Sequence, residues 1–197
     1  IAVLDPIQFT LNYLVGKLRE QGVEISGDVR EGTLPAEGIK DISLHKSVPF
    51  GEMLKKLNKP SDNLVAECIL KVLGSEKGKN RKGTSSDGIN VVLDWLKSAG
   101  VDITGVRMKD GSGLSRQDYV SPRSYCQMLR AIYKHSEGRI FVDSLPIAGV
   151  DGSLRTRMKG TPAEGKVFAK TGSLSSVSSL SGYTTTKGGD LISFVIF

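Results

Sequence analysis

The stretch FAKTGSLSSVSSLSGYTTTKGGDLISFVIF, residues 168–197, alternates apolar residues with small or polar ones. Such alternation predicts half-buried strands, because successive side chains of a strand point to opposite faces of a sheet. We expect strands over residues 165–174, 177–186 and 190–197, and a hairpin at the KGG that joins the second to the third. The last part of the chain therefore predicts an antiparallel sheet.

The preceding residues carry mostly helical patterns. In residues 86–100, apolar side chains recur at intervals of three and four, which places them on one face of a helix. Helices followed by strands indicate an α+β fold, with a helical part over about residues 1–160 and sheet strands over about 165–197. The other expected helices cover residues 8–20, 50–59, 62–74 and 121–134, and short strands are expected at 22–29 and 39–46.

Composition narrows the function classes. The 197 residues carry a formal net charge of +6, but much of it lies in SEKGKNRKG, residues 75–83, which is typical of a solvated surface loop. No aromatic residue interleaves with this cluster, so it offers no stacking platform and we expect no nucleic-acid partner. Cys68 and Cys126 lack metal-ligand spacing and are expected to be free, buried thiols. We expect neither a metal nor a cofactor.

The ends of the chain suggest part of a longer protein. It begins with IAVLDP, without Met, and finishes in an apolar segment. No run approaches the roughly 18 to 20 consecutive apolar residues that a membrane-spanning helix needs. Part of a longer protein can lack its signal peptide, so the absence of a leader from this sequence says nothing about the compartment. Strand edges without a neighbouring strand predict self-association.

Two short motifs carry the chemical argument. SDN, residues 61–63, falls in a break between two expected helices, and KTGS, residues 170–173, falls in an expected strand. Alone, SDN is typical of a helix cap and a lysine is typical of an edge strand. Together, in this order, they resemble two of the three motifs of the penicillin-recognising serine enzymes, whose third motif is Ser-x-x-Lys.

The resemblance extends over nearly the whole chain. VLDP, LNKPSDNLVAE, DGSGLSRQDYVSP, LPIAGVDGSLRTRM and FAKTGSLSSVSSLSGY resemble the successive landmarks of the class C low-molecular-mass penicillin-binding proteins, the D-alanyl-D-alanine carboxypeptidase/endopeptidase family. This resemblance implies a β-lactamase/transpeptidase-like fold, of which residues 1–197 would form the C-terminal part of the catalytic domain. We leave Asp110, Arg116 and Arg155 without roles, since a turn and surface charges account for them.

The resemblance also implies roles for six residues. Ser61 would relay a proton, Asn63 would offer its amide to the substrate, and Lys170 would attract the substrate carboxylate. The substrate-binding residues would be Thr171 and Ser173, which supply hydroxyls, with the Ser173 N–H as half of the oxyanion hole, and Gly172, which lets the substrate approach the strand closely.

The nucleophile is the missing element. SLHK, residues 43–46, matches Ser-x-x-Lys, but it lies in an expected strand and Pro49 disfavours a helix there. In the resembled family the nucleophile also lies far upstream. We therefore reject Ser43 and expect the isolated chain to be inactive.

The resemblance implies part of a serine-type enzyme that cleaves peptidoglycan stem peptides through an acyl-enzyme and is acylated by β-lactam antibiotics. The resembled family is exported to the periplasm or cell-wall compartment. Two alternatives stay open at this point: a non-catalytic peptidoglycan-binding module, and a relative of β-lactamases or esterases.

Overall fold

The computed structural model describes residues 3–33 and 35–197, and its contacts divide the chain into two units, residues 1–46 and 47–197. In the first unit, helix α1 spans Pro6–Glu20 and begins two residues before the expected start. The Asp5 carboxylate accepts a hydrogen bond from the Gln8 N–H (2.9 Å), and Pro6 occupies the first helical position.

The strands expected at 22–29 and 39–46 were wrong, since the described residues of these segments form no strand. Their sequences alternate as strands do. A strand, however, also needs a hydrogen-bonding neighbour, and none pairs with them within the part of the chain that the structure describes. Alternation alone did not supply that neighbour.

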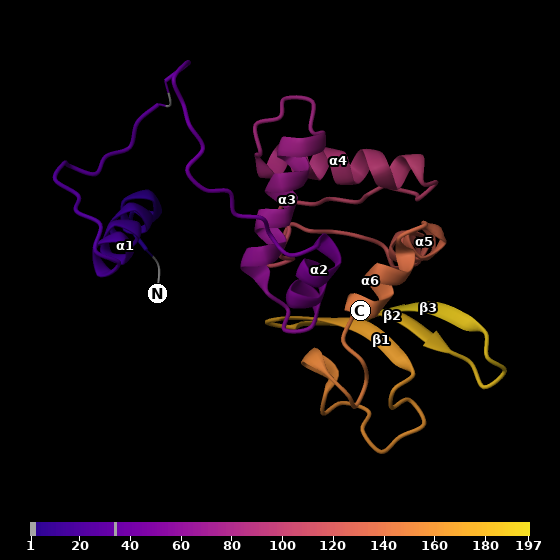
Figure 1. Cartoon of the computed structure of the whole chain (residues 1–197). Helices are drawn as coiled ribbons and strands as arrows, with labels where there is room; N and C mark the ends of the chain where they lie inside the picture. The colour runs from indigo at the N-terminus through magenta and orange to yellow at the C-terminus, as the bar shows by residue number, and fades with distance from the viewer. Residues whose placement is uncertain (1–2, 34) are drawn as a thin grey trace. The chain divides into compact units, whose positions relative to one another are not determined.

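The second unit contains a helical layer and a sheet (Figure 1). Ser121 caps α5 by accepting from the Ser124 N–H (3.0 Å), as its position before Pro122 predicts. The short helix α6 was not expected, because seven residues are too few to show a helical period. The helices are α2 (Phe50–Asn58), α3 (Asn63–Lys77), α4 (Ser85–Ser98), α5 (Pro122–Lys134) and α6 (Gly138–Ser144).

The expected antiparallel sheet is present, which confirms the α+β class. Its strands are β1 (Val167–Leu174), β2 (Val177–Thr185) and β3 (Leu191–Ile196), in the order β1-β2-β3. Only two residues join β1 to β2, and this tight turn pairs Lys170 with Ser181 across the strands. This register places the side chains of Lys170 and Ser181 beside each other on one face of the sheet.

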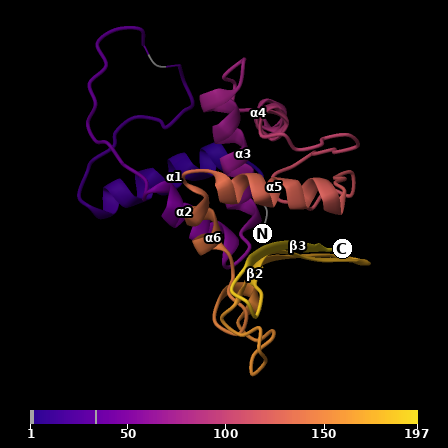
Figure 2. The ribbon, with the colours of Figure 1, turned by 90° about the vertical axis from the view of Figure 1, so that its right-hand side faces the viewer.

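Helices cover one face of the sheet, and loops lie under one end of the other face, as Figure 2 shows from the side. On one face, Tyr183 is buried against apolar residues of α5 and α6, and its hydroxyl donates to the Leu129 carbonyl (2.7 Å). On the other face, Ala169 packs with Leu154 of the short 3₁₀ helix η1 (Gly152–Leu154). This double burial fixes β1, the strand that carries Lys170.

Two glycines bring α3 and α4 into close contact. A Cβ on Gly74 would lie 2.8 Å from the Gly88 nitrogen, and a Cβ on Gly88 would overlap the Leu70 carbonyl oxygen. Beside them, buried Asp87 accepts from the Thr84 hydroxyl (2.9 Å) and the Asn80 amide (3.1 Å). The end of the basic segment is thus attached to the start of α4.

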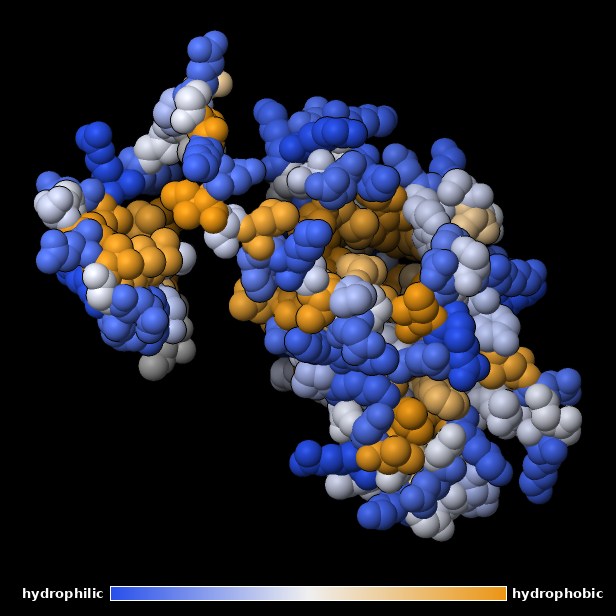
Figure 3. All heavy atoms as spheres, viewed as in Figure 1, coloured by the Kyte–Doolittle hydropathy of each residue, from blue (hydrophilic) through white to orange (hydrophobic). Residues whose placement is uncertain are grey.

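Apolar side chains also reach the surface over the helices of this unit (Figure 3). On α3, Leu64 is 73% exposed, whereas Leu70 is buried. Cys68 is exposed and Cys126 is half-buried, both free, so the expectation of buried thiols fails for Cys68. Among the residues with described coordinates, no helix combines the length and the apolar character that crossing a bilayer requires.

We predict that Gly88→Ala lowers the free energy of unfolding by about 1 to 3 kcal/mol, because the added methyl group forces α3 and α4 apart. Asn90→Ala, at an exposed position of the same helix, is the matched control. Urea unfolding followed by circular dichroism measures both. Equal stability of the two variants would contradict the close packing of the helices.

Candidate active site

A strained turn between α2 and α3 presents Ser61. Ser61 has φ +64°, a left-handed conformation that costs a residue with a Cβ about 1 kcal/mol or more. Asp62 is the N-cap of α3 and accepts from the Val65 N–H (3.0 Å), as expected from the sequence. Ser61, Asp62 and Asn63 all line the adjoining cleft, and one carboxylate oxygen of Asp62 is engaged in the cap.

Lys170 connects this turn to the sheet. Its Nζ donates to the Ser61 Oγ (2.7 Å) and to the Thr171 carbonyl oxygen (2.7 Å). The fold therefore brings together the two motifs that the sequence separates by 109 residues. An ammonium group has no acceptor, so the Ser61 oxygen accepts and its own proton points elsewhere.

Burial lowers the pKa of Lys170 below its ordinary value of 10.5. The ion pairs formed within residues 3–33 and 35–197 do not include Lys170. A half-buried cation without a carboxylate partner is electrostatically suited to an anionic group that enters from solvent.

The outer edge of β1 is open beyond Ala169. The Ala169 N–H donates to the Pro146 carbonyl (2.9 Å), and this edge carries the N–H groups of alternate residues. By that alternation, Thr171 and Ser173 also direct their N–H groups outward, and neither group has a partner in the described chain. An extended peptide could therefore add to β1 at this edge.

The hydroxyls of this strand differ in their surroundings. The Thr171 Oγ1 lies 2.9 Å from the Ser153 Oγ, whereas Ser173 is exposed at the cleft. A Cβ on Gly172 would overlap the Ser179 hydroxyl on β2. Glycine at position 172 therefore leaves room for the Ser179 hydroxyl, a contact that the sequence motif alone does not show.

The cleft has a volume of about 510 Å³ and includes all six residues expected from the sequence. Sequence reasoning missed Ser179 and Ser181 of β2, which face it as cross-strand partners of Gly172 and Lys170. A two-residue connection between β1 and β2 would have given this register. Other residues that were missed are Asn58, Ser112, Leu114 and Tyr125.

The opposite wall is the DGSG turn, residues 110–113. Glu67 on α3 accepts from the N–H groups of Gly111 and Ser112, both at 2.9 Å. Asp110 accepts from the N–H groups of Gly113 (2.6 Å) and Ser115 (2.7 Å), which agrees with its reading as a turn residue. The wall is thus attached to the helix that begins at Asn63.

Two further groups adjoin this wall. Burial raises the pKa of Asp118, which accepts from the Lys109 N–H (2.6 Å). Arg116, read as a surface charge, donates to the Ser175 carbonyl (3.3 Å) in the turn between β1 and β2. For residues 3–33 and 35–197, no group of three His, Cys, Asp or Glu side chains has an arrangement suited to a metal ion.

Comparison with known proteins gives consistent matches. Residues 1–197 match the family described as D-Ala-D-Ala carboxypeptidase 3 (S13). The D-alanyl-D-alanine carboxypeptidase DacB of Haemophilus influenzae is 32% identical over 198 residues, which cover 100% of this chain and 41% of that protein. The D-alanyl-D-alanine carboxypeptidase of Actinomadura sp. (strain R39) is 38% identical over 181 residues, covering 88% of this chain and 33% of that protein.

A solved structure agrees. The crystal structure of penicillin binding protein 4 from H. influenzae, complexed with a β-lactam, matches with a TM-score of 0.86 and 30% identity over 99% of this chain and 45% of that one. The chain therefore spans less than half the length of these relatives. It has the corresponding transpeptidase-like fold.

We predict that the Lys170 amine titrates below pH 10.5, because burial disfavours its charged form. Between its own pKa and 10.5 the unfolded chain binds more protons, so this group makes the free energy of unfolding rise with pH in that window. Carbon-13 NMR of the lysine Cε atoms measures the midpoint, and Lys170→Met assigns the signal. A midpoint at or above 10.5 would refute the buried environment.

Proposed function

The chain belongs to the D-Ala-D-Ala carboxypeptidase 3 (S13) family, and from that premise we propose that it forms the substrate-holding part of a serine-type D-Ala-D-Ala carboxypeptidase/endopeptidase. The substrate would be a peptidoglycan stem peptide, and penicillins would acylate the same enzyme. The supporting observation is the 2.7 Å hydrogen bond from Lys170 to Ser61 at the open edge of β1. Residues 1–197 would be the C-terminal part of the catalytic domain.

Substrate binding would begin with electrostatic attraction between the substrate carboxylate and Lys170. The C-terminal carboxylate of a D-Ala-D-Ala peptide would approach Lys170, the cation of the cleft that lacks a carboxylate partner. The hydroxyls of Thr171 and Ser173 would donate to the same carboxylate. These three residues belong to one strand, β1, and all line the cleft, so they would select a peptide by its free C-terminus.

The peptide backbone would then pair with β1. The outward N–H groups of Thr171 and Ser173 have no partner within the described residues, and the Ser173 N–H would also stabilise the oxyanion of the scissile carbonyl. Gly172 would keep the strand free of a side chain where the peptide passes. Losing one oxyanion donor typically costs about 2.7 to 4 kcal/mol in the transition state.

Proton transfer would involve Ser61. A serine nucleophile would attack the carbonyl carbon of the penultimate D-Ala, and the C–N bond to the terminal D-Ala would break. The Ser61 Oγ accepts from Lys170, so its own hydroxyl proton is available for the leaving amine. The Asn63 amide would hold the substrate backbone, and water would later hydrolyse the acyl-enzyme.

We place that nucleophile outside this chain. Ser43, in the one Ser-x-x-Lys of the sequence, lies in an exposed segment that is neither helix nor strand, so no helical turn brings Lys46 beside it. The relatives are more than twice as long as the matched region. The chain alone would bind peptide without hydrolysing it.

A stem-peptide substrate also implies a periplasmic or cell-wall location.

A second function is a non-catalytic peptidoglycan-binding module. The observation in its favour is the lack of a helical Ser-x-x-Lys within residues 3–33 and 35–197.

We also propose self-association through the open edges of β1 and β3, supported by the exposure of Ile192 (45%) and Ile196 (60%). Light scattering that shows a monomer would exclude this association.

We predict that Lys170→Met abolishes binding of an N-acyl-D-Ala-D-Ala peptide, because the carboxylate loses its cation. Lys166→Met removes the same charge from an exposed residue just before β1 and is the matched control. NMR titration of the Thr171 and Ser173 amides measures the affinity. Equal binding by both variants would reject Lys170 as the carboxylate anchor.

We predict that penicillin leaves the mass of this chain unchanged, since no Ser-x-x-Lys within residues 3–33 and 35–197 is helical. Intact-mass spectrometry of the chain and of a full-length protein that contains it decides the question. An adduct on the chain alone would show that it holds the nucleophile. An adduct on the full-length protein supports the enzyme, whereas its absence there favours the binding module.

A further inference from the structure

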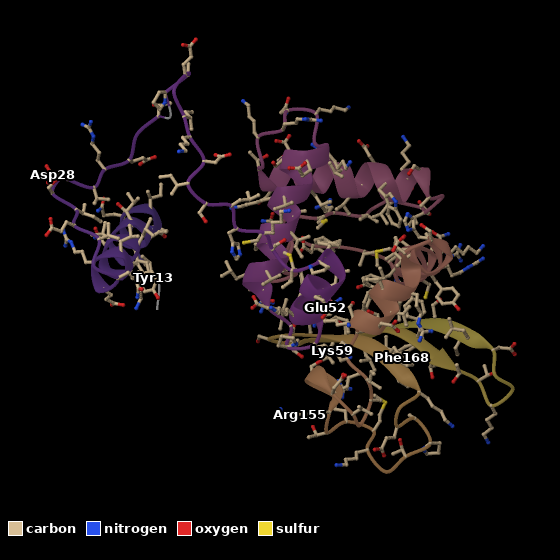
Figure 4. The ribbon with its side chains drawn as sticks, in the orientation of Figure 1. Tyr13, Asp28, Glu52, Lys59, Arg155 and Phe168 are labelled. Atoms are coloured by element: carbon tan, nitrogen blue, oxygen red, sulfur yellow. The ribbon has the colours of Figure 1, made fainter. Side chains whose placement is uncertain are left out.

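A segment next to the cleft, residues 146–154, joins the two motifs of the site at several points. Its central contact is an ion pair between the Lys59 Nζ and the Asp151 Oδ2, 2.6 Å apart. Lys59 follows α2 and lies two residues before Ser61. In Figure 4, Lys59 lies where α2 approaches the sheet.

The other oxygen of the same carboxylate reaches the sheet side. The Asp151 Oδ1 accepts from the Ile147 N–H (2.9 Å), and Ile147 forms a β-bridge with Phe168 of β1. The Ala169 N–H donates to the Pro146 carbonyl (2.9 Å), which attaches the segment directly before Lys170. One carboxylate therefore connects the helix break to the strand.

One backbone contact and one side-chain contact reinforce this connection. The Ser153 N–H donates to the Lys59 carbonyl (3.0 Å), and the Ser153 hydroxyl contacts the Thr171 hydroxyl (2.9 Å). At Gly152, φ is +57° and a Cβ would lie 2.7 Å from the Lys59 carbonyl oxygen. A side chain there would push the segment away from the helix break.

The ion pair is also more enclosed than the others. Its side chains are 21% and 38% exposed, whereas each side chain in the other three pairs of the described residues is at least 44% exposed. Exposed pairs contribute about 0 to 1 kcal/mol, and breaking a more enclosed pair costs more because it leaves a charge poorly solvated. The Lys59–Asp151 pair is therefore suited to hold two segments in register.

We propose that Asp151 is a positioning residue, whose carboxylate sets the separation of Ser61 and Lys170 by joining Lys59 to the backbone that pairs with β1. The structural part of this inference is independent of the reaction, and its consequence for substrate rests on the proposed function. When the carboxylate is lost, the strained turn at Ser61 can relax away from Lys170. The hydroxyl would then leave the amine, and water would reach Lys170.

Asp151→Asn tests the proposal in this chain, because an amide can still accept from Ile147 but cannot pair with Lys59. Asp143→Asn is the matched control, since it removes the same charge from the exposed pair with Arg139. The first readout is the titration midpoint of the Lys170 Cε signal. We expect Asp151→Asn to raise it towards 10.5, and Asp143→Asn to leave it unchanged.

The direction separates positioning from charge. Losing a negative charge while Lys59 stays cationic would by itself lower the Lys170 midpoint, whereas hydration after the turn relaxes raises it. Lys59→Gln breaks the same pair from the other side and gives a second variant if Asp151→Asn does not fold. Because the lost positive charge also raises the Lys170 midpoint, an unchanged or lowered midpoint in this variant contradicts the relaxation of the turn. Lys59→Arg keeps the pair and should keep the wild-type midpoint.

The second readout is affinity for an N-acyl-D-Ala-D-Ala peptide, which we expect Asp151→Asn to weaken on the order of tenfold through misplaced contacts. An unchanged or lowered midpoint in both Asp151→Asn and Lys59→Gln overturns the proposal, even when their melting temperatures fall. If the wild-type chain binds no peptide, the proposed function fails, and the Lys170 midpoint still decides the positioning role.

Discussion

The hydrogen bond from Lys170 to Ser61 is the interaction on which the site depends, because its partners come from a helix break and from an edge strand. Neither partner would hold the other in place by itself. The fold partly buries the Lys170 ammonium group, and Ser61 has a strained backbone conformation. Packing on both faces of the sheet and the attachments of residues 146–154 supply the rigidity that this single contact needs.

The cleft combines one rigid wall with one open edge. The carboxylates of Glu67 and Asp110 accept hydrogen bonds from backbone N–H groups of the turn at residues 110–113. Because both carboxylates are engaged in this way, the wall contributes its shape to the cleft. The opposite side is β1, whose outward Thr171 and Ser173 N–H groups have no hydrogen-bond partner among the residues that the structure describes. Backbone pairing would give affinity for any extended peptide, and the lysine with its hydroxyls would restrict binding to a free carboxyl end. Recognition is thereby divided between geometry and charge.

Much of the second unit followed from local patterns in the sequence. The alternation in residues 168–197 gave the sheet, and the period of residues 86–100 gave α4. Residues 22–29 did not form a strand, because pairing is a property of two segments and the sequence pattern describes only one. Lys170 and Ser61 were expected from motifs, but Glu67 and Asp151 have no motif of their own. Their importance comes from backbone groups that only the folded chain brings near them.

The backbone conformation of Ser61 limits what evolution can place there. A positive φ favours glycine or asparagine, and neither offers a hydroxyl to Lys170. Threonine retains the hydroxyl, but its branched Cβ fits that conformation poorly. Stability and chemistry therefore select for different residues at one position. A search for stabilising substitutions in this protein would select Ser61, and each stabilised variant would lose the hydroxyl that accepts the hydrogen bond from Lys170.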